Sequence, residues 1–354
     1  MNNNSKIKVL IVDDSVLVRD ILQNGLSKDP LIEVVGTAPD PYIARDKIVF
    51  KKPDVIILDV KMPRMSGIDF LKKLIPQYPI PVIMVSAVTA PGAETTLDAL
   101  EFGAVDFVLK PSGNSGHKLS DMMDELIRKI KIAARVNPDN LNQKIKNVKS
   151  FSHDATLDKM RDLVIGIGAS TGGTTAITKI VNAFPPNMPG TVIVQHMPPN
   201  FTRMFADKLN ETAKVNVKEA VDGERIIAGH IFIAPGGFHM KVNGSRGEYF
   251  LKCYKGKKVN RHCPSVEVLF DSIAKNVGKN AIGVMLTGMG SDGAKGMLAM
   301  RERGARTIAQ DEKSCIVFGM PNEAFKLGGV EKLVSLDNIT STLLKLLKEK
   351  KNAL

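Results

Sequence analysis

The chain of 354 residues is long enough for two domains of ordinary size. Its 44% hydrophobic and 24% charged residues exclude a collagen-like, disordered or coiled-coil protein. The formal net charge of +12 predicts an acidic partner, whether nucleic acid, an anionic membrane or an acidic protein surface. Three cysteines without a CxxC pair, and apolar runs far shorter than the roughly 20 residues of a membrane span, favour a cytoplasmic protein without membrane insertion.

Residues 1–136 show short apolar runs alternating with amphipathic stretches. Five of the runs predict buried strands, at residues 8–12, 32–37, 55–58, 82–86 and 107–109. Helical spacing of apolar residues predicts helices at 16–27, 41–50, 67–75 and 119–136. Strands that alternate with helices of this length form a parallel sheet with helices on both faces. The predicted fold class is therefore α/β, with five strand–helix units in one compact domain.

The chain changes character at residue 137. Residues 137–160 begin with Asn-Pro and are polar, which predicts a linker. Residues 161–350 resume the alternation in LVIGIGAS, TVIVQHM, HIFIAPG, AIGVMLTG and RTIAQD, with antiparallel strands expected around 249–254. This pattern predicts a second, doubly wound α/β domain with a mostly parallel sheet. Residues 1–117 carry 13 basic and 14 acidic side chains, so the excess positive charge lies in the linker and the second domain.

Five polar residues of the first domain lie at the ends of predicted strands. Asp13 and Asp14 follow the first strand, Asp59 the third and Lys110 the fifth, and Ser86 ends the fourth. Because ligands bind at the carboxyl ends of the strands in an open parallel sheet, we expect these side chains at one edge. Three carboxylates suit a divalent cation such as Mg²⁺, and a lysine and a hydroxyl suit an anion formed on one of them. The set indicates an aspartyl phosphate site, although the aspartate pair alone would equally suit a helix cap.

The segment GIGASTGG allows two interpretations. In one, Ser170 lies in a nucleophile elbow, a tight turn that exposes a serine above the start of a helix. In the other, the glycines form a loose dinucleotide-binding loop, which requires an acidic residue about 20 residues further on. The next predicted strand ends instead in Gln195-His196, which favours a general base beside the serine, although a lone histidine here would also suit a structural turn.

A second glycine-rich segment, LTGMGSDGAKG, holds Asp292. Glycines let the backbone approach a substrate closely and turn its amides inward, as an oxyanion hole requires. Asp292 would orient His196 as in a serine triad, or it would cap a helix beside a phosphate-binding nest. The chain order Ser170, His196, Asp292 differs from the order in α/β-hydrolases, so the elbow does not place the protein in that class.

The first domain resembles the receiver domain of response regulators over roughly residues 6–135, on the segments VLIVDDS, VIILDVKMPRMSG, VIMVSA and GAVDFVLKP. The resemblance implies phosphorylation of Asp59 and Mg²⁺ bound by Asp13, Asp14 and Asp59. It also implies that Ser86 and Lys110 sense the phosphoryl group, and it suggests a cis bond between Lys110 and the proline that follows it.

The second domain resembles the protein-glutamate methylesterase family of bacterial chemotaxis, the CheB family. The matching segments include GASTGG, QHMPPNFTRMFADKLN, HIFIAPGGFHM, CPSVEVLFDSIA, LTGMGSDGAKGM and QDEKSCIVFGMPNEA, between residues 163 and about 329. A receiver domain followed by a methylesterase domain is also the domain order of that family. With the receiver and linker, the resemblance covers nearly the whole chain.

The second resemblance implies hydrolysis of glutamate methyl esters on chemoreceptor signalling helices, with deamidation of glutamines as a related reaction. Ser170 would be the nucleophile, His196 the base and Asp292 the orienting acid. The backbone amides of Thr171 and Met289 are candidates for the oxyanion hole, and the esterase reaction needs no cofactor. A chemotaxis histidine kinase would donate the phosphoryl group, and the unphosphorylated receiver would block access to the serine.

A DNA-binding response regulator and a nicotinamide-dependent oxidoreductase are the alternative functions. The positive charge favours the first, but a helix-turn-helix needs only a few short helices, whereas residues 161–350 read as strand–helix units. The segment GIGASTGG favours the second, but the acidic ribose partner is missing. We therefore expect chemoreceptors and a kinase as partners, and no nucleic acid.

Overall fold

The computed structural model describes residues 6–86, 90–111, 119–141, 151–153, 157 and 162–352. The chain divides into two compact units, a first unit of residues Met1–Lys144 and a second unit of residues Ile145–Leu354. Within the described residues, no helix is long and apolar enough to cross a membrane.

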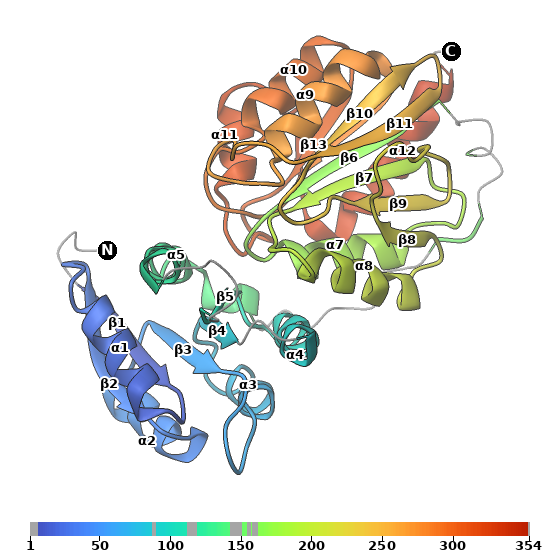
Figure 1. Ribbon diagram of the computed structural model, residues 1–354. Helices are drawn as coiled ribbons and strands as arrows, with labels where there is room; N and C mark the ends of the chain where they lie inside the picture. The colour runs from blue at the N-terminus through green and yellow to red at the C-terminus, as the bar shows by residue number, and fades with distance from the viewer. Residues whose placement is uncertain are drawn as a thin grey trace. The chain divides into compact units, whose positions relative to one another are not determined.

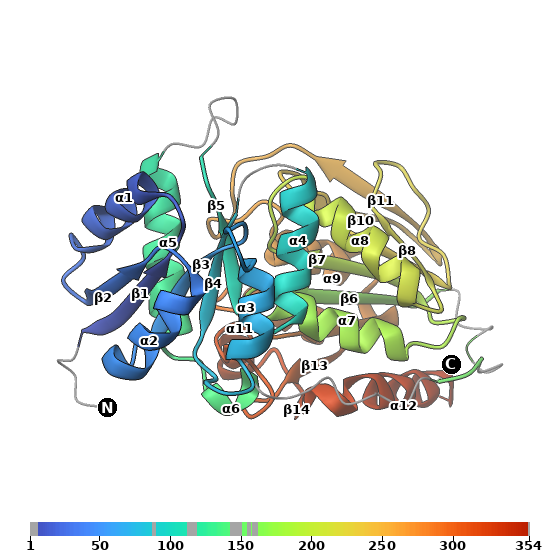
Figure 2. The ribbon, with the colours of Figure 1, turned by 90° about the horizontal axis from the view of Figure 1, so that it is seen from below.

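The first unit is a five-stranded parallel sheet in the order β2-β1-β3-β4-β5 (Figure 1). The strands are β1 (Ile7–Val12), β2 (Ile32–Ala38), β3 (Val55–Asp59), β4 (Val82–Ser86) and β5 (Asp106–Leu109). The helices are α1 (Val16–Leu26), α2 (Pro41–Lys51), α3 (Gly67–Leu74), α4 (Ala90–Glu101) and α5 (Leu119–Ala133), followed by the short α6 (Pro138–Leu141). All residues of β3 and β4 are buried, because α1 and α5 cover one face of the sheet and α2, α3 and α4 cover the opposite face (Figure 2). The α/β class and the five predicted strands are confirmed.

Side-chain caps fix where the helices of the first unit begin. The Ser15 hydroxyl accepts a hydrogen bond from the amide of Val18 in α1, and the carboxylate of Asp40 accepts from two amides of α2. The sequence pattern does not predict α4, because its segment APGAETTLDALE has a proline and a glycine in the first turn and two threonines after them, all weak helix formers.

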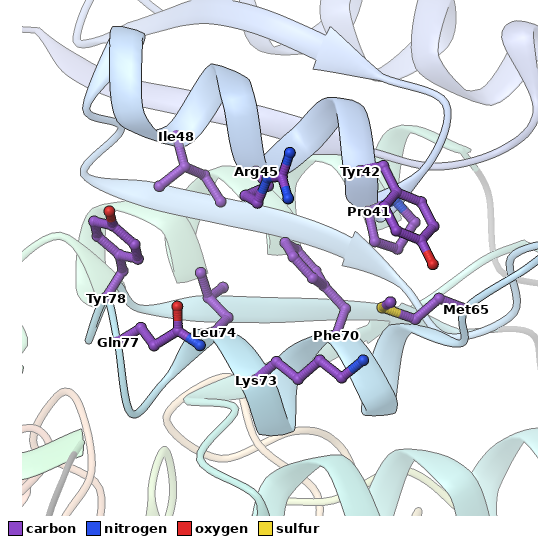
Figure 3. A pocket seen from close by; sticks show the side chains of 10 residues that line it. All are labelled: Pro41, Tyr42, Arg45, Ile48, Met65, Phe70, Lys73, Leu74, Gln77 and Tyr78. Carbon is purple, nitrogen blue, oxygen red and sulfur yellow. The ribbon is translucent and has the colours of Figure 1, made fainter.

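A cavity of about 280 Å³ lies between α2 and α3 of the first unit (Figure 3). Its lining is mostly apolar and aromatic, with Arg45 and Lys73 as the cationic side chains. None of the five residues predicted for phosphorylation lines this cavity, so it is separate from the aspartate site.

The second unit contains a seven-stranded sheet in the order β14-β13-β12-β6-β7-β9-β8, with every neighbouring pair parallel. The strands are β6 (Val164–Ala169), β7 (Gly190–Gln195), β8 (Asn216–Glu219), β9 (His230–Ile233), β12 (Ala281–Met285), β13 (Arg306–Gln310) and β14 (Lys332–Val334). The helices are α7 (Gly173–Ala183), α8 (Phe201–Thr212), α9 (Val266–Asn276), α10 (Ala294–Glu302), α11 (Met320–Lys326) and α12 (Ile339–Asn352), with 3₁₀ turns η2 (Gly278–Asn280) and η3 (Leu336–Asn338). The strand order reverses at β6, which places the expected ligand site at the carboxyl ends of β6, β7 and β12.

A separate antiparallel pair joins β10 (His239–Ser245) to β11 (Glu248–Tyr254), as the sequence predicted. Helix α9 follows this pair and packs directly on β6. A Cβ atom on Gly166 would lie 2.5 Å from Ile273 Cδ1, and one on Gly168 would lie 2.3 Å from Val266 Cγ1. The two glycines of β6 therefore let α9 approach the sheet closely, with its N-terminus at the carboxyl end of β6.

Candidate functional site

Three carboxylates of the first unit converge at the carboxyl ends of β1 and β3. One ligand oxygen from each of Asp13, Asp14 and Asp59 lies within 4.8 Å of the others. Asp13 and Asp59 are buried, whereas Asp14 is exposed. Three negative charges at this separation repel one another, and oxygen ligands in such a cluster match the preference of Mg²⁺. The cluster therefore fits the metal that the sequence predicted.

Lys110, just after β5, provides the positive charge of this cluster. Its Nζ lies 2.8 Å from Asp13 Oδ2 and 3.0 Å from Asp59 Oδ1. Burial raises the pKa of Asp59, although Lys110 opposes this effect. Burial acts to lower the pKa of Lys110, but the bonds to the two carboxylates outweigh it and the pKa is raised. Lys110 thus remains protonated and holds the two buried aspartates in place.

Ser86 ends β4 and is linked to α4. Its buried hydroxyl donates to the carbonyl of Gly92 at 3.2 Å and accepts from Thr96 Oγ1 at 2.7 Å. The structure corrects one expectation for this unit, the cis bond after Lys110. In the described part of the chain the cis peptide bond precedes Pro264 instead.

The three predicted residues of the second unit lie at neighbouring strand ends. Ser170 directly follows β6, His196 directly follows β7, and Asp292 lies in the loop between β12 and α10. Strand β6 pairs with both β7 and β12, and the amide of His196 donates to the carbonyl of Ala169 at 3.2 Å. Parallel pairing therefore brings the loops that carry these residues together at the point where the strand order reverses.

Asp292 and His196 are hydrogen-bonded, with 2.9 Å between Oδ2 and Nε2. The carboxylate also accepts from Ser265 Oγ at 2.8 Å and from the amide of Val266 at 2.7 Å, both at the N-terminus of α9. Burial acts to raise the pKa of Asp292, but His196, followed by Asn260 and Ser265, lowers it to about 2. Asp292 is therefore ionised at neutral pH and can stabilise a protonated His196.

The other ring nitrogen of His196 is available for the serine. His196 Nδ1 is buried and has no hydrogen-bond partner within the described chain. The Ser170 hydroxyl makes no hydrogen bond in the same part of the structure, so Ser170 and His196 are neighbours that are not hydrogen-bonded. Bonds between catalytic groups are often long in free enzymes and shorten with substrate bound.

A tight turn at residues 259–262 brings two further residues to this site. The His262 ring stacks on the His196 ring, with centroids 3.6 Å apart and planes 4° from parallel. Asn260 Nδ2 donates to Asp292 Oδ1 at 2.8 Å. Sequence reasoning did not find these residues, because they come from the loop between β11 and α9 rather than from a strand end of the large sheet. Their position just before the segment CPSVEVLFDSIA was the available signal.

The residues predicted for the oxyanion hole, Thr171 and Met289, lie on backbone next to Ser170. A Cβ atom on Gly288 would lie 2.7 Å from Ser170 Cβ, so only glycine lets the β12–α10 loop pass this closely. Met289 follows Gly288, and its amide donates no hydrogen bond within the described residues. Thr171 is buried, and its carbonyl accepts from Thr287 Oγ1 at 3.0 Å. Thr171 thus lies directly after Ser170 in the chain, and Met289 lies in the β12–α10 loop that passes beside it.

A receiver-like aspartate site in one unit and a serine–histidine–aspartate cluster in the other define a response regulator whose output unit is a hydrolase. Residues 9–123 match the response regulator receiver domain, and residues 165–343 match the CheB methylesterase family. The chain belongs to the CheB methylesterase family. The predicted resemblance and enzyme class are thereby confirmed.

Individual relatives match nearly the whole chain. The protein-glutamate methylesterase/protein-glutamine glutaminase of Syntrophotalea carbinolica is 55% identical over 98% of this chain and 99% of the relative. The protein of the same name from Escherichia coli (strain K12) is 48% identical over 96% of this chain and 97% of its own length. The crystal structure of the Thermotoga maritima CheB methylesterase catalytic domain matches with a TM-score of 0.51 and 37% identity, over 52% of this chain and 98% of that chain.

Proposed function

We propose that this protein hydrolyses glutamate methyl esters on chemoreceptor signalling helices, and deamidates glutamines there, under the control of phosphorylation at Asp59. The observation that carries the proposal is the Asp292–His196 pair, joined at 2.9 Å at the carboxyl end of the strand beside Ser170. The names of the full-length relatives agree with this substrate class. The three cysteines are free within the described residues, which favours a reducing cytoplasm.

The esterase reaction follows from the positions of the three side chains. Ser170 Oγ attacks the ester carbonyl while His196 Nδ1 accepts the serine proton, and Asp292 stabilises the imidazolium. The amides of Thr171 and Met289 would stabilise the oxyanion of the tetrahedral intermediate. His196 then donates the proton to the departing methoxide, so methanol leaves and a glutamyl ester of Ser170 remains.

Water completes the reaction by attacking the glutamyl ester. His196 accepts a proton from this water, and the collapse of the second intermediate returns the proton to Ser170 Oγ and releases a glutamate carboxyl group. With a glutamine substrate the leaving group is ammonia, and the remaining steps are the same. These steps use only groups of the chain and water.

Asp59 is the proposed phosphoryl acceptor in the first unit. Asp13, Asp14 and Asp59 would hold a Mg²⁺ ion, which supplies positive charge to the transferred phosphoryl group. An oxygen of Asp59 attacks the phosphorus atom of a phosphohistidine, which we propose belongs to a chemotaxis histidine kinase. The P–N bond breaks, and the kinase histidine leaves and takes a proton from water. Lys110 then pairs with the phosphoryl oxygens, and the Ser86 hydroxyl turns from the Gly92 carbonyl to donate to them.

The change of hydrogen-bond partner at Ser86 can transmit phosphorylation of Asp59 to helix α4. Because Ser86 is bonded to Thr96 in α4, a new bond from Ser86 to the phosphoryl group changes the position of α4. We propose that the unphosphorylated first unit blocks access to Ser170, that residues 137–160 link the units, and that phosphorylation relieves the block.

Methanol release from a methylated chemoreceptor tests the function directly. Wild-type enzyme should release methanol, acetyl phosphate with Mg²⁺ should raise the rate, and Ser170→Ala should abolish it. Methanol release at the same rate by wild type and Ser170→Ala would contradict the assigned site.

A further inference from the structure

A strongly basic loop borders the catalytic residues. The loop, residues 255–261 between β11 and α9, is called here the basic loop. It contains Lys255, Lys257, Lys258 and Arg261 and no acidic residue. All four cationic side chains are exposed, and none forms an ion pair with any acidic group in the described part of the chain. Lys255 lies over the ring of Phe238 at 5.6 Å, but no carboxylate neutralises any of the four cations in this part of the structure, so they are available to an anionic ligand.

The conformation of the basic loop is fixed by hydrogen bonds. At its base, His239 Nε2 bonds to the carbonyl of Lys257 at 2.9 Å. At its tip, the amides and carbonyls of Val259 and His262 bond to each other at 2.9 and 3.0 Å. These bonds close a tight turn in which Asn260 and Arg261 both have left-handed backbones, with φ of 50° and 72°. That conformation is unfavourable for arginine, so the surrounding contacts must hold it.

The tip of the basic loop is attached to the catalytic pair. Asn260 is hydrogen-bonded to Asp292 at 2.8 Å, and the ring of His262 is stacked on that of His196 at 3.6 Å. Arg261 lies between these two residues in the chain, and neighbouring Cα atoms are only about 3.8 Å apart. The backbone of Arg261 is therefore anchored between two residues that contact the proposed catalytic acid and base, and its exposed side chain forms an ion pair with no acidic group of the described chain.

We infer that the basic loop binds carboxylates that flank the ester in the substrate, so that the enzyme selects acidic segments. Arg261 makes the close contact, because a planar guanidinium binds a carboxylate through two parallel hydrogen bonds. Lys257 and Lys258 add longer-range attraction, which speeds encounter and weakens with salt. This inference rests on the proposed function and names the residues that recognise its substrate.

The product of the reaction is itself a carboxylate, which the basic loop would also bind. Each turnover converts a neutral methyl ester into a carboxylate on the same substrate segment. A segment that has already lost one ester therefore carries one more anionic group for the basic loop. The enzyme would then act faster on the remaining esters of a partly hydrolysed segment than on the first ester of a fully esterified one.

Two helical peptides would test the inference with the full-length enzyme, acetyl phosphate and Mg²⁺. Each carries one glutamate methyl ester, flanked by four glutamates in the acidic peptide and by four glutamines in the neutral one. Wild type should have a kcat/KM for the acidic peptide roughly ten times that for the neutral peptide at low salt, mostly through KM. Arg261→Gln should reduce this ratio to about 2, and Arg261→Lys should restore part of it. Raising NaCl to 0.5 M should also reduce the ratio in wild type.

Arg246→Gln is the matched control. Arg246 is also exposed and left-handed, with φ of 53°, but it lies in the turn at the other end of the β10–β11 pair. A seven-residue strand separates the two turns, about 20 Å at the usual rise. Arg246→Gln should therefore keep the wild-type ratio.

Arg261→Asn separates charge from conformation, because asparagine adopts the left-handed region readily. This variant should lose the acidic preference while its melting temperature equals or exceeds that of wild type. The inference would be wrong, and the proposed function would still stand, if wild type were active and two variants kept its ratio of kcat/KM between the acidic and neutral peptides. These variants are Arg261→Gln and the triple variant Lys257→Gln/Lys258→Gln/Arg261→Gln. If wild type hydrolysed neither of the two peptides nor the methylated receptor, the proposed function would be wrong, and the inference would fail with it.

Discussion

Asp292 holds the imidazole of His196 at 2.9 Å while its carboxylate also binds the N-terminus of α9. The proposed catalytic acid is therefore positioned by a helix that packs on β6, the strand that presents Ser170. His196, Asn260 and the N-terminus of α9 all donate hydrogen bonds to this carboxylate, and together they keep it ionised and fix its direction. We therefore expect both catalysis and the stability of the second unit to depend on this side chain.

Ser170→Ala should remove nearly all methanol release and leave the melting temperature unchanged. The serine hydroxyl makes no hydrogen bond in the described structure, so its loss affects chemistry alone. His196→Ala should be equally severe, since single losses in such triads typically cost about 10³–10⁶ in rate. Steady-state kinetics and thermal unfolding measure both effects. If Ser170→Ala retained more than about a tenth of the wild-type rate, the triad assignment would be wrong.

Asp292→Asn should differ from the other two variants in stability. Its catalytic loss should be smaller than that of Ser170→Ala, because Asp292 orients and stabilises the base rather than reacting. Its melting temperature should be lower than those of Ser170→Ala and His196→Ala, because the negative charge at the N-terminus of α9 is lost. Equal melting temperatures for all three variants would show that Asp292 does not anchor α9.

The positions of Ser170 and His196 could be predicted because each residue directly follows a strand end, whereas Asp292 was found through its glycine-rich loop. The apolar runs before Ser170 and His196 mark buried strands, and the carboxyl ends of parallel strands meet at one edge of a sheet. Asn260 and His262 could not be predicted in this way, because a turn after the antiparallel pair carries them and no local pattern reveals which loop reaches the site. The bond from Ser86 to Thr96 is likewise a tertiary contact with no periodic signal.

Glu267 should make the second unit less stable as the pH rises. It lies in the first turn of α9 and accepts from the amide of Gly293 at 3.0 Å. Burial, together with the negative charges of Asp271 and Asp292, raises its pKa from 4.5 to about 7. A carboxyl with a raised pKa contributes stability that is fully present below about pH 4.5 and is lost as the pH rises through about 7.

Glu267→Gln tests this pH dependence, since the amide oxygen can still accept from Gly293. The variant should be more stable than wild type by about 1–2 kcal/mol at pH 8, after allowing for partial solvent screening. At pH 4.5 the two proteins should be nearly equal in stability. Urea unfolding at both values measures the difference, and a constant offset between the two proteins would count against the ionisation of Glu267 as the cause.

Phosphorylation should depend on the three aspartates of the first unit. Asp13→Ala should abolish both Mg²⁺ binding and phosphoryl incorporation, because it removes a metal ligand and a partner of Lys110. Asp59→Asn should abolish incorporation because an amide cannot serve as the acceptor. Incubation with radiolabelled acetyl phosphate measures incorporation. Labelling of Asp59→Asn at the wild-type level would place the acceptor elsewhere.

Loss of the first unit and loss of its phosphorylation should have opposite effects on the esterase rate. Asp59→Asn should give a folded enzyme that stays at the basal rate with or without acetyl phosphate, because no phosphoryl group reaches Ser86 and Lys110. Contacts between domains of one chain are usually modest in area, so a phosphoryl group can shift them by a few kcal/mol at most. That shift corresponds to roughly ten- to hundred-fold activation of wild type.

Deletion of residues 1–150 should raise the rate above the basal level without any phosphodonor, since the proposed block on Ser170 is removed altogether. The deletion leaves out the aspartate site and keeps Ser170, His196, Asp292 and the basic loop, so its substrate preference should match that of full-length enzyme. Methanol release from receptor measures the rate, and circular dichroism shows whether the shortened protein is folded. A folded deletion variant no faster than unphosphorylated full-length enzyme would mean that the first unit activates the esterase or recruits its substrate instead of blocking the site.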